Sequence, residues 1–214
     1  MQNLISNSCV GAFLYYRNKQ VFDNPFMWTK IEIEDYISLI KNFDTIDFNN
    51  IDFSFEHMIV HGKVSPYKSV VGYLDNKVKL HYMHYIKSKS YDNPTRLGGM
   101  NIYGNNIMEY AREKYFIRLS RMNRSPTFLC NLKVRDDEKY QRYITGLLEI
   151  ETNHPLYILT YKSKRNKVYH KKHIHILYVN DDILNSGMAV VARYVHKYYP
   201  FLRINQSEKI KTNT

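Results

Sequence analysis

Apolar residues repeat along the chain with two periods, one typical of helices and one of strands. Between Ile33 and Ile40 they recur at helical spacing, and Thr29 and Glu32 ahead of them match a capping box, which predicts a helix here. The same spacing predicts four more helices, over about Val10–Tyr16, Asn106–Asn123, Asp136–Leu148 and Gly187–Tyr198.

Strands are expected where β-branched and aromatic residues alternate with polar ones or form short apolar runs. These segments are Asn3–Asn7, the surroundings of Phe53 and Phe55, Lys68–Leu74, Lys77–Tyr85, Thr127–Leu132, Leu156–Tyr161 and Ile174–Val179. In the second half single strands interleave with helices, an order typical of α/β proteins. We therefore predict a three-layered α/β/α fold with helices on both faces of a mixed sheet. Its expected central strands contain Ile5, Leu80, Phe128–Leu132, Ile158 and Ile176.

The length of 214 residues suits one α/β domain, which we place at residues 1–204, followed by a polar tail at 205–214. The segment Ser88–Asn106 is rich in glycine and contains a proline, which predicts a long loop. Because it follows the strand that carries His84, we expect this loop to border a functional site and to be more mobile than its flanks.

Composition points to a folded, basic protein with anionic partners. Hydrophobic residues make up 44% and charged residues 24%, and the formal net charge is +11. That charge favours an anionic sugar or sugar phosphate, or peripheral contact with an acidic membrane surface. The Lys and Arg residues are spread along the chain and match no nucleic-acid motif, so no nucleic-acid partner is expected. The 20 Tyr residues suit a half-buried binding surface, but an A+T-rich genome explains them equally well.

The cysteine content and the hydropathy pattern predict a cytoplasmic location. The two cysteines, Cys9 and Cys130, are too few for a disulfide framework and are typical of a reducing compartment. Residues 1–16 have no positively charged start ahead of a long apolar run, which argues against a signal peptide. No apolar stretch approaches the eighteen or so residues that a membrane-spanning helix needs.

Cys9 is a candidate nucleophile because it stands where a predicted helix begins. The positive end of a helix dipole lowers the pKa of a thiol, and a thiolate with a nearby His forms a nucleophile–base pair. The alternative is that Cys9 is a small buried apolar residue, as most free cysteines are. Cys130 lies within an apolar strand and is expected to be a core residue.

His84 is the candidate general base, because it ends a predicted strand beside the glycine-rich segment. Strand alternation places His84 on the face of Leu80 and Tyr82, and His81 on the opposite face, where it is structural or exposed. If this strand runs parallel to the first, Cys9 and His84 meet at the carboxyl edge of the sheet, within reach of a hydrogen bond or one water. The alternative is a core-edge histidine with a structural role.

Arg118 and Arg121 flank the apolar face of the helix that contains Tyr115, and we expect these three side chains to hold a phosphate or carboxylate of a substrate. The alternative for Arg118 is an ordinary surface arginine that buries its stem. Asn7 and Ser8, beside Cys9, are expected to contact the same substrate.

His173 and His175 share one face of a predicted strand, but no carboxylate or thiol cluster accompanies them, so no metal site is expected. The chain contains no Walker loop, no Gly-x-Gly-x-x-Gly helix start and no CxxC pair. We therefore expect no cofactor.

Three motifs are typical of a known family: Ser6-Asn7-Ser8-Cys9-Val10-Gly11, Asn24-Pro25-Phe26 and Leu80-His81-Tyr82-Met83-His84-Tyr85. They resemble a bacterial family, domain of unknown function 1919, often labelled as an exopolysaccharide-biosynthesis protein. The resemblance covers about residues 4 to 161. It implies that Cys9 and His84 are functional and that the chain acts in surface-polysaccharide biosynthesis.

A weaker similarity connects the chain to domain of unknown function 1796, labelled a papain-like cysteine peptidase. Pro25-Phe26-Met27-Trp28 has Met27 where that family has Asp, and the helix from Tyr115 to Arg121 keeps two of the family's three arginines. A catalytic triad that used this Asp has no counterpart here.

Two functions follow from these residues. The first is a cytoplasmic enzyme of exopolysaccharide biosynthesis that uses Cys9 and His84 for acyl transfer or hydrolysis on a sugar-linked substrate. The second is a non-catalytic module that binds an anionic glycan or a nucleotide-sugar enzyme. Loss of Cys9 would abolish the first activity and spare the second.

Overall fold

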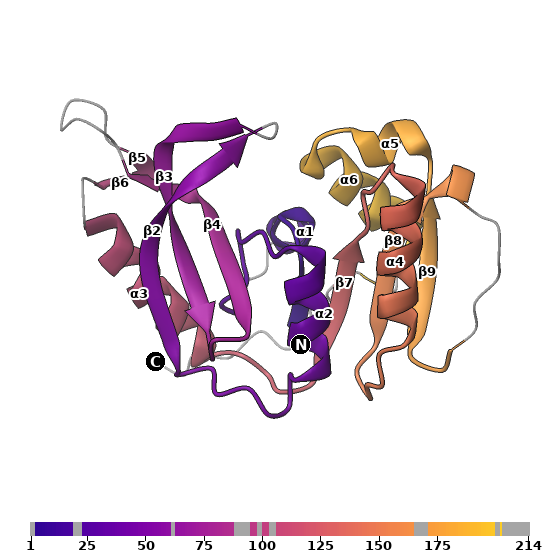
Figure 1. Cartoon of the computed structure of the whole chain (residues 1–214), viewed down its shortest axis with the longest axis horizontal. Helices are drawn as coiled ribbons and strands as arrows, with labels where there is room; N and C mark the ends of the chain where they lie inside the picture. Colours follow the sequence, from indigo (N-terminus) through magenta and orange to yellow (C-terminus); the bar gives the residue numbers. More distant parts are fainter. Residues whose placement is uncertain are drawn as a thin grey trace, which may run out of the picture.

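The computed structural model describes residues 3–18, 23–60, 63–87, 95–97, 100–102, 106–164, 171–199 and 202. One of its sheets has four strands, and all neighbouring strands in it are parallel (Figure 1). In spatial order the strands are β1 (Asn3–Ser6), β7 (Pro126–Asn131), β8 (Leu156–Tyr161) and β9 (Ile174–Val179).

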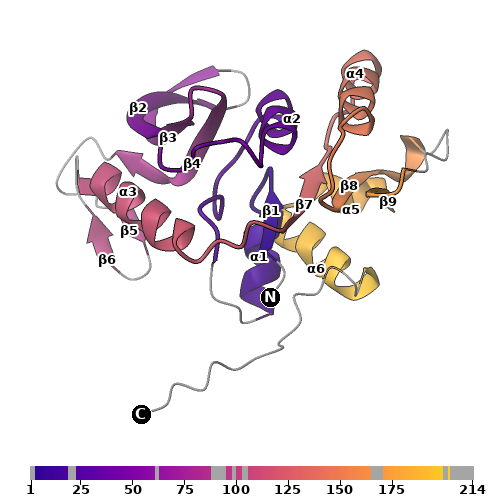
Figure 2. The ribbon, with the colours of Figure 1, turned by 90° about the horizontal axis from the view of Figure 1, so that it is seen from below.

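Helices cover both faces of this sheet, as Figure 2 shows from below. One face carries α1 (Val10–Arg17) and α6 (Met188–Tyr198), and the other carries α2 (Ile33–Lys41) and α4 (Asp137–Leu148); the short α5 (Asp181–Asn185) leads from β9 to α6. Strand alternation sorts the side chains between two apolar clusters. In β7, for example, Leu129 packs with α1 and α6, whereas Phe128 and Cys130 pack towards α2 and α4.

A second, antiparallel sheet lies beside the first and consists of β2 (Ile51–Val60), β3 (Lys63–Leu74) and β4 (Val78–Lys87). The turn between β3 and β4 contains Asp75 and Asn76, both with positive φ, as a tight hairpin turn requires. Helix α3 (Asn106–Leu119) packs against this sheet. Leu80 of β4 and Phe128 of β7 belong to one continuous apolar cluster, which joins the two sheets.

The segment predicted to be a long loop contains a small hairpin. Its strands are β5 (Thr95–Leu97) and β6 (Met100–Ile102), and β5 contacts β4. The prediction of an unstructured loop is therefore wrong at these positions. The other residues between 88 and 105, including those expected to be mobile, lie outside the described residues.

The α/β class, with helices on both faces of a sheet and both parallel and antiparallel strand pairs in the fold, is confirmed. The expectation that Leu80 lies in the same sheet as Ile5 is wrong, because β4 pairs with β3 in the antiparallel sheet. The capping box is also wrong: helix α2 starts at Ile33 with Glu32 as its N-cap, and the Thr29 hydroxyl donates to the Phe26 carbonyl instead. The domain boundary at residue 204 stays a prediction.

Among the described residues, no helix is both long enough and apolar enough to cross a lipid bilayer.

Candidate functional site

A crevice of about 670 Å³ opens at the carboxyl edge of the parallel sheet, between the ends of β1 and β7. After β1 the chain passes to α1 on one face, and after β7 it passes to α4 on the other face (Figure 2). Open α/β sheets bind ligands where the connections after two neighbouring strands pass to opposite faces of the sheet, because these connections diverge and leave a crevice between them. The lining comes from Asn7–Cys9, from residues 30–33, from the segment between Asn131 and Tyr143, and from Met188.

The Asn7 side chain ties the two strand ends together. Its Oδ1 accepts a hydrogen bond from the Asn131 amide N–H at 2.7 Å, and its Nδ2 donates to the Asn131 carbonyl at 3.4 Å. The Asn7 carbonyl in turn accepts from the Ile31 amide at 3.0 Å. One buried asparagine therefore positions three walls of the crevice.

Four helices begin at the crevice and point their amino ends towards it. The lining residues at these ends are Cys9, the N-cap of α1; Glu32, the N-cap of α2; Asp136, the N-cap of α4; and Met188, the first residue of α6. The Asp136 side chain caps α4 by accepting from the Lys139 amide at 2.7 Å. The amino end of a helix carries a partial positive charge. No acidic residue stands in the first turn of α1 or α6, whereas the acidic N-caps Glu32 and Asp136, with further acidic residues in the first turns of α2 and α4, offset that charge at the other two helices.

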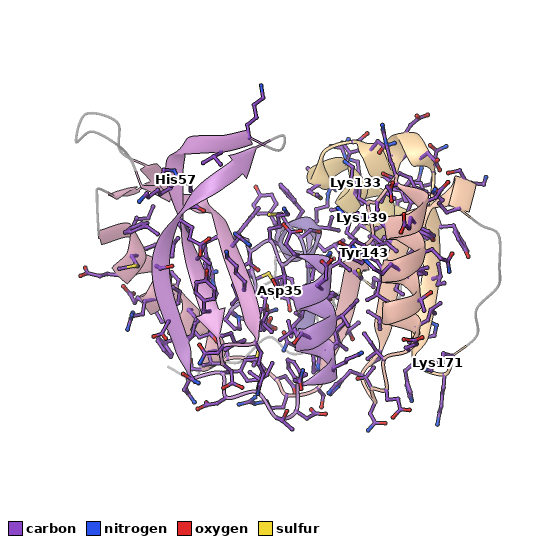
Figure 3. The ribbon with its side chains drawn as sticks, viewed as in Figure 1. Asp35, His57, Lys133, Lys139, Tyr143 and Lys171 are labelled. Carbon is purple, nitrogen blue, oxygen red and sulfur yellow. The ribbon has the colours of Figure 1, made fainter. Side chains whose placement is uncertain are left out.

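Cationic side chains add to this positive field. Four of them line the crevice: Lys30, Lys133, Arg135 and Lys139. Figure 3 shows Lys133 and Lys139 with Tyr143 along the edge of α4 that faces the centre of the molecule. The acidic lining residues are Glu32, which pairs with Lys30 at 2.5 Å, and Asp136, which caps α4.

Two polar atoms in the lining are buried and have no hydrogen-bond partner among the described residues: Ser8 Oγ and Asn131 Oδ1. Asn131 is only 5% exposed, and its Nδ2 donates to Met188 Sδ at 3.4 Å, which fixes the orientation of the amide. Buried polar atoms normally find a partner, so these two mark positions where a bound molecule can supply one.

Cys9 stands in the lining as the sequence predicts, at the start of α1 and at the carboxyl end of β1, with a half-buried side chain. Its expected lowered pKa is not found. Burial raises the pKa of the Cys9 thiol above its ordinary value, and a backbone hydrogen bond only partly opposes this. At neutral pH Cys9 is therefore a thiol, not the activated thiolate that nucleophilic catalysis needs.

His84 lies on β4, in the antiparallel sheet, so its strand does not run beside β1 as the prediction required; the parallel neighbour of β1 is β7. The register of β4 shifts between Tyr82 and Ile86, so regular strand alternation does not hold at His84. Its side chain lies outside the described part of the structure, and the proximity of Cys9 and His84 stays a prediction.

His81 is closer to the crevice than the sequence indicates. Its backbone forms two hydrogen bonds with Lys30, at 2.8 and 2.9 Å, and Lys30 is a lining residue. The His81 side chain is half-buried, and burial, followed by the charges of Lys79 and Lys30, lowers its pKa. His81 is therefore neutral at physiological pH.

The three residues expected on the arginine-containing helix do not join Asn7, Ser8 and Cys9. Tyr115 is fully buried, and its hydroxyl donates to the Phe48 carbonyl at 2.8 Å. Arg118 donates to the Met27 carbonyl at 3.3 Å, and Arg121 lies exposed beyond the end of α3. None of the three is among the described residues that line the crevice.

The sequence interpretation missed the cations that follow β7. Lys133 and Arg135 stand between a buried strand and the predicted helix start at Asp136, and this position is the signal that would have identified them. Within the described ranges, no group of three or more His, Cys, Asp or Glu side chains is arranged to hold a metal ion.

Residues 2–97 match the family model described as Domain of unknown function (DUF1919). The matched segment contains two walls of the crevice, Asn7–Cys9 and residues 30–33, whereas the wall that follows β7 lies beyond it. No curated protein matches the chain.

Proposed function

Residues 2–97 belong to the DUF1919 family, whose description names no reaction. From the lining of the crevice we propose that the chain binds an anionic small molecule. The ligand carries a phosphate or carboxylate group, which the crevice holds at the carboxyl edge of the parallel sheet. A phosphorylated or otherwise anionic sugar, the partner expected from the sequence, is the ligand class we favour.

The observation that supports this proposal is the meeting of four helix amino ends with four cationic side chains around one space. Peptide N–H groups at helix starts hydrogen-bond phosphate oxygens, and the helix dipoles favour the negative charge. Lys133, Arg135 and Lys139 add positive charges to the lining. The volume of about 670 Å³ lies within the range of small-molecule sites and suits a ligand the size of a sugar phosphate or larger.

The test is calorimetric titration of the full chain with ethyl phosphate, a minimal phosphate ester, at low and at high salt. The double variant Arg135→Ala/Lys139→Ala should bind at least tenfold more weakly, because it removes two of the four crevice cations. The matched control is Lys41→Ala/Lys172→Ala, which removes the same charge from exposed positions at the carboxyl end of α2 and ahead of β9. An equal loss in both double variants would show unspecific attraction to a basic protein and contradict the proposal.

A second candidate function is Cys9-dependent acyl transfer or hydrolysis on a sugar-linked substrate in exopolysaccharide biosynthesis. The position of Cys9 in the crevice favours it, because an anionic group bound at the helix starts would lie beside the thiol. The raised pKa of Cys9 disfavours it in the unliganded protein. Substitution Cys9→Ser separates the two functions, since it would abolish thiol chemistry and leave anion binding intact.

A further inference from the structure

The two unpartnered atoms in the crevice indicate which polar groups the ligand carries besides its anionic group. Asn131 Oδ1 is a carbonyl-type oxygen, which only accepts hydrogen bonds. Its orientation is fixed, because the backbone of Asn131 is held by Asn7 and the Nδ2 atom by Met188. The partner that this oxygen requires is therefore a donor.

Ser8 Oγ lies in the same lining, one residue after Asn7 and next to Cys9. A hydroxyl both donates and accepts, so Ser8 pairs with any hydroxyl or amine that reaches it. The Ser8 amide donates to Ser6 Oγ at 3.4 Å, which helps to hold the turn between β1 and α1. The side-chain hydroxyl takes no part in that contact.

A phosphate dianion offers acceptor oxygens only. It is a good partner for the helix starts and the cations, but it leaves Asn131 Oδ1 without a hydrogen bond. A ligand that satisfies the whole crevice combines an anionic group with hydroxyl donors on the same molecule.

We propose, on the basis of the function proposed above, that the ligand is a phosphate ester of a polyhydroxy compound, and that Asn131 and Ser8 select its hydroxyl groups. The anionic group lies towards the helix starts and Lys139. The carbon skeleton lies against Ser8 and Asn131 between the ends of β1 and β7. A sugar phosphate and glycerol phosphate share this chemistry, and they are compared in the test.

The experiment measures the affinity of the full chain for three phosphate esters by calorimetry: ethyl phosphate, glycerol 1-phosphate and glucose 1-phosphate. These probes carry the same charged group and differ in their hydroxyl donors. At least one hydroxylated ester should bind tenfold or more tightly than ethyl phosphate, because only a hydroxylated ester provides the donor that Asn131 Oδ1 lacks. The ratio between the two hydroxylated esters then identifies the preferred skeleton.

Two variants assign the effect to residues. Ser8→Ala and Asn131→Leu should each weaken the binding of the hydroxylated esters more than that of ethyl phosphate, and bring their affinities to within about threefold of the affinity for ethyl phosphate. Ser120→Ala is the matched control, because Ser120 is exposed beyond the end of α3 and its hydroxyl donates to the Ile117 carbonyl. It should change none of the three affinities.

Thermal unfolding separates a ligand-binding role of Ser8 from a structural one. A buried hydroxyl without a partner does not stabilise the fold, so Ser8→Ala should keep or raise the midpoint temperature while selectivity is lost. A lower midpoint together with equal weakening of all three esters would assign Ser8 a structural role and overturn the inference.

The two proposals fail in different ways. If ethyl phosphate binds as tightly as both hydroxylated esters, the selection of hydroxyl groups is wrong and the anionic site stands. If none of the three esters binds, the anionic site is wrong and this inference fails with it.

Discussion

The side chain of Asn7 hydrogen-bonds both the N–H and the carbonyl of the Asn131 backbone. The paired residues of β1 and β7 end at Ser6 and Leu129, so the Asn7 amide group continues the connection between the two strands after their own ladder stops. The crevice lies at this point because the backbones of the two strands diverge after Ser6 and Leu129, while the Asn7 side chain still connects them. Asn7 therefore contributes both to the stability of the fold and to the shape of the proposed binding site.

Substitution Asn7→Leu should destabilise the protein by about 1–3 kcal/mol, because it leaves the buried Asn131 N–H without its partner. Urea unfolding measures this change directly. Asn49→Leu, at an exposed position in the loop ahead of β2, should change the free energy of unfolding by less than about 0.5 kcal/mol. Equal effects of the two substitutions would show that Asn7 does not hold the strands together.

The alkylation rate of Cys9 should increase with pH and reach half of its maximum above the free-thiol value of about 8.5. Burial disfavours the thiolate, and the pKa of Cys9 is raised for that reason. Iodoacetamide labelling of the folded protein reports this residue, because Cys130 is fully buried. A half-maximum near pH 7 or below would contradict the structure and support the Cys9-dependent enzyme.

Some parts of the fold follow from local pattern, and these were predicted from the sequence. The bounds of β8 and β9 agree with the predicted strands at both ends, because each is a short apolar run between polar turns. Cys9 was placed correctly at a strand end and a helix start, because small residues separate an apolar run from a helical one.

The parts that depend on pairing between distant segments were not predictable from pattern. Alternation in β4 indicates a strand but does not identify its neighbour, and β4 pairs with β3 instead of entering the parallel sheet. The hydrogen-bond partners of the buried Tyr115 and the half-buried Arg118 are likewise Phe48 and Met27, which are distant in sequence. The prediction of a capping box at Thr29 is wrong because the Thr29 hydroxyl donates to the Phe26 carbonyl, and Glu32 is the N-cap of the helix.

The buried carboxyl of Asp23 should make stability depend on pH. Burial raises its pKa, and the hydrogen bond from the Tyr15 hydroxyl, 2.5 Å long, only partly opposes the shift. A carboxyl whose pKa is higher in the folded state stabilises most below its unfolded pKa of about 3.9, and this contribution is lost as the pH rises through the folded value.

The variant Asp23→Asn keeps an oxygen that can accept from Tyr15 but does not titrate. The midpoint temperature of the wild-type protein minus that of the variant should therefore decrease from pH 3.5 to pH 7. Thermal unfolding at intervals of half a pH unit measures the difference. An increase of this difference with pH would mean that the carboxylate is stabilised in the fold and that burial does not dominate its pKa.

Gly11 is the residue that allows α1 to begin close against β1. A Cβ atom added at Gly11 would lie 2.7 Å from Ser6 Cβ, which is too short for two carbon atoms and involves an atom next to the backbone. Ser6 cannot move aside by changing its rotamer, so the helix start must shift away from the strand. Because Cys9 at this helix start lines the crevice, the shift alters the anion site as well as the packing.

Gly11→Ala should therefore lower the free energy of unfolding by about 1–3 kcal/mol and weaken ethyl phosphate binding at least threefold. Gly146→Ala, within helix α4, is the matched control. Its added methyl group meets only the end of the flexible Ile37 side chain of α2, at 3.1 Å. Alanine is favoured over glycine in a helix by roughly 0.5–1 kcal/mol, so this variant should be unchanged or more stable and should bind normally. If Gly11→Ala is as stable as Gly146→Ala, the close contact between α1 and β1 is wrong. If it is destabilised but binds ethyl phosphate normally, the start of α1 does not contribute to the anion site.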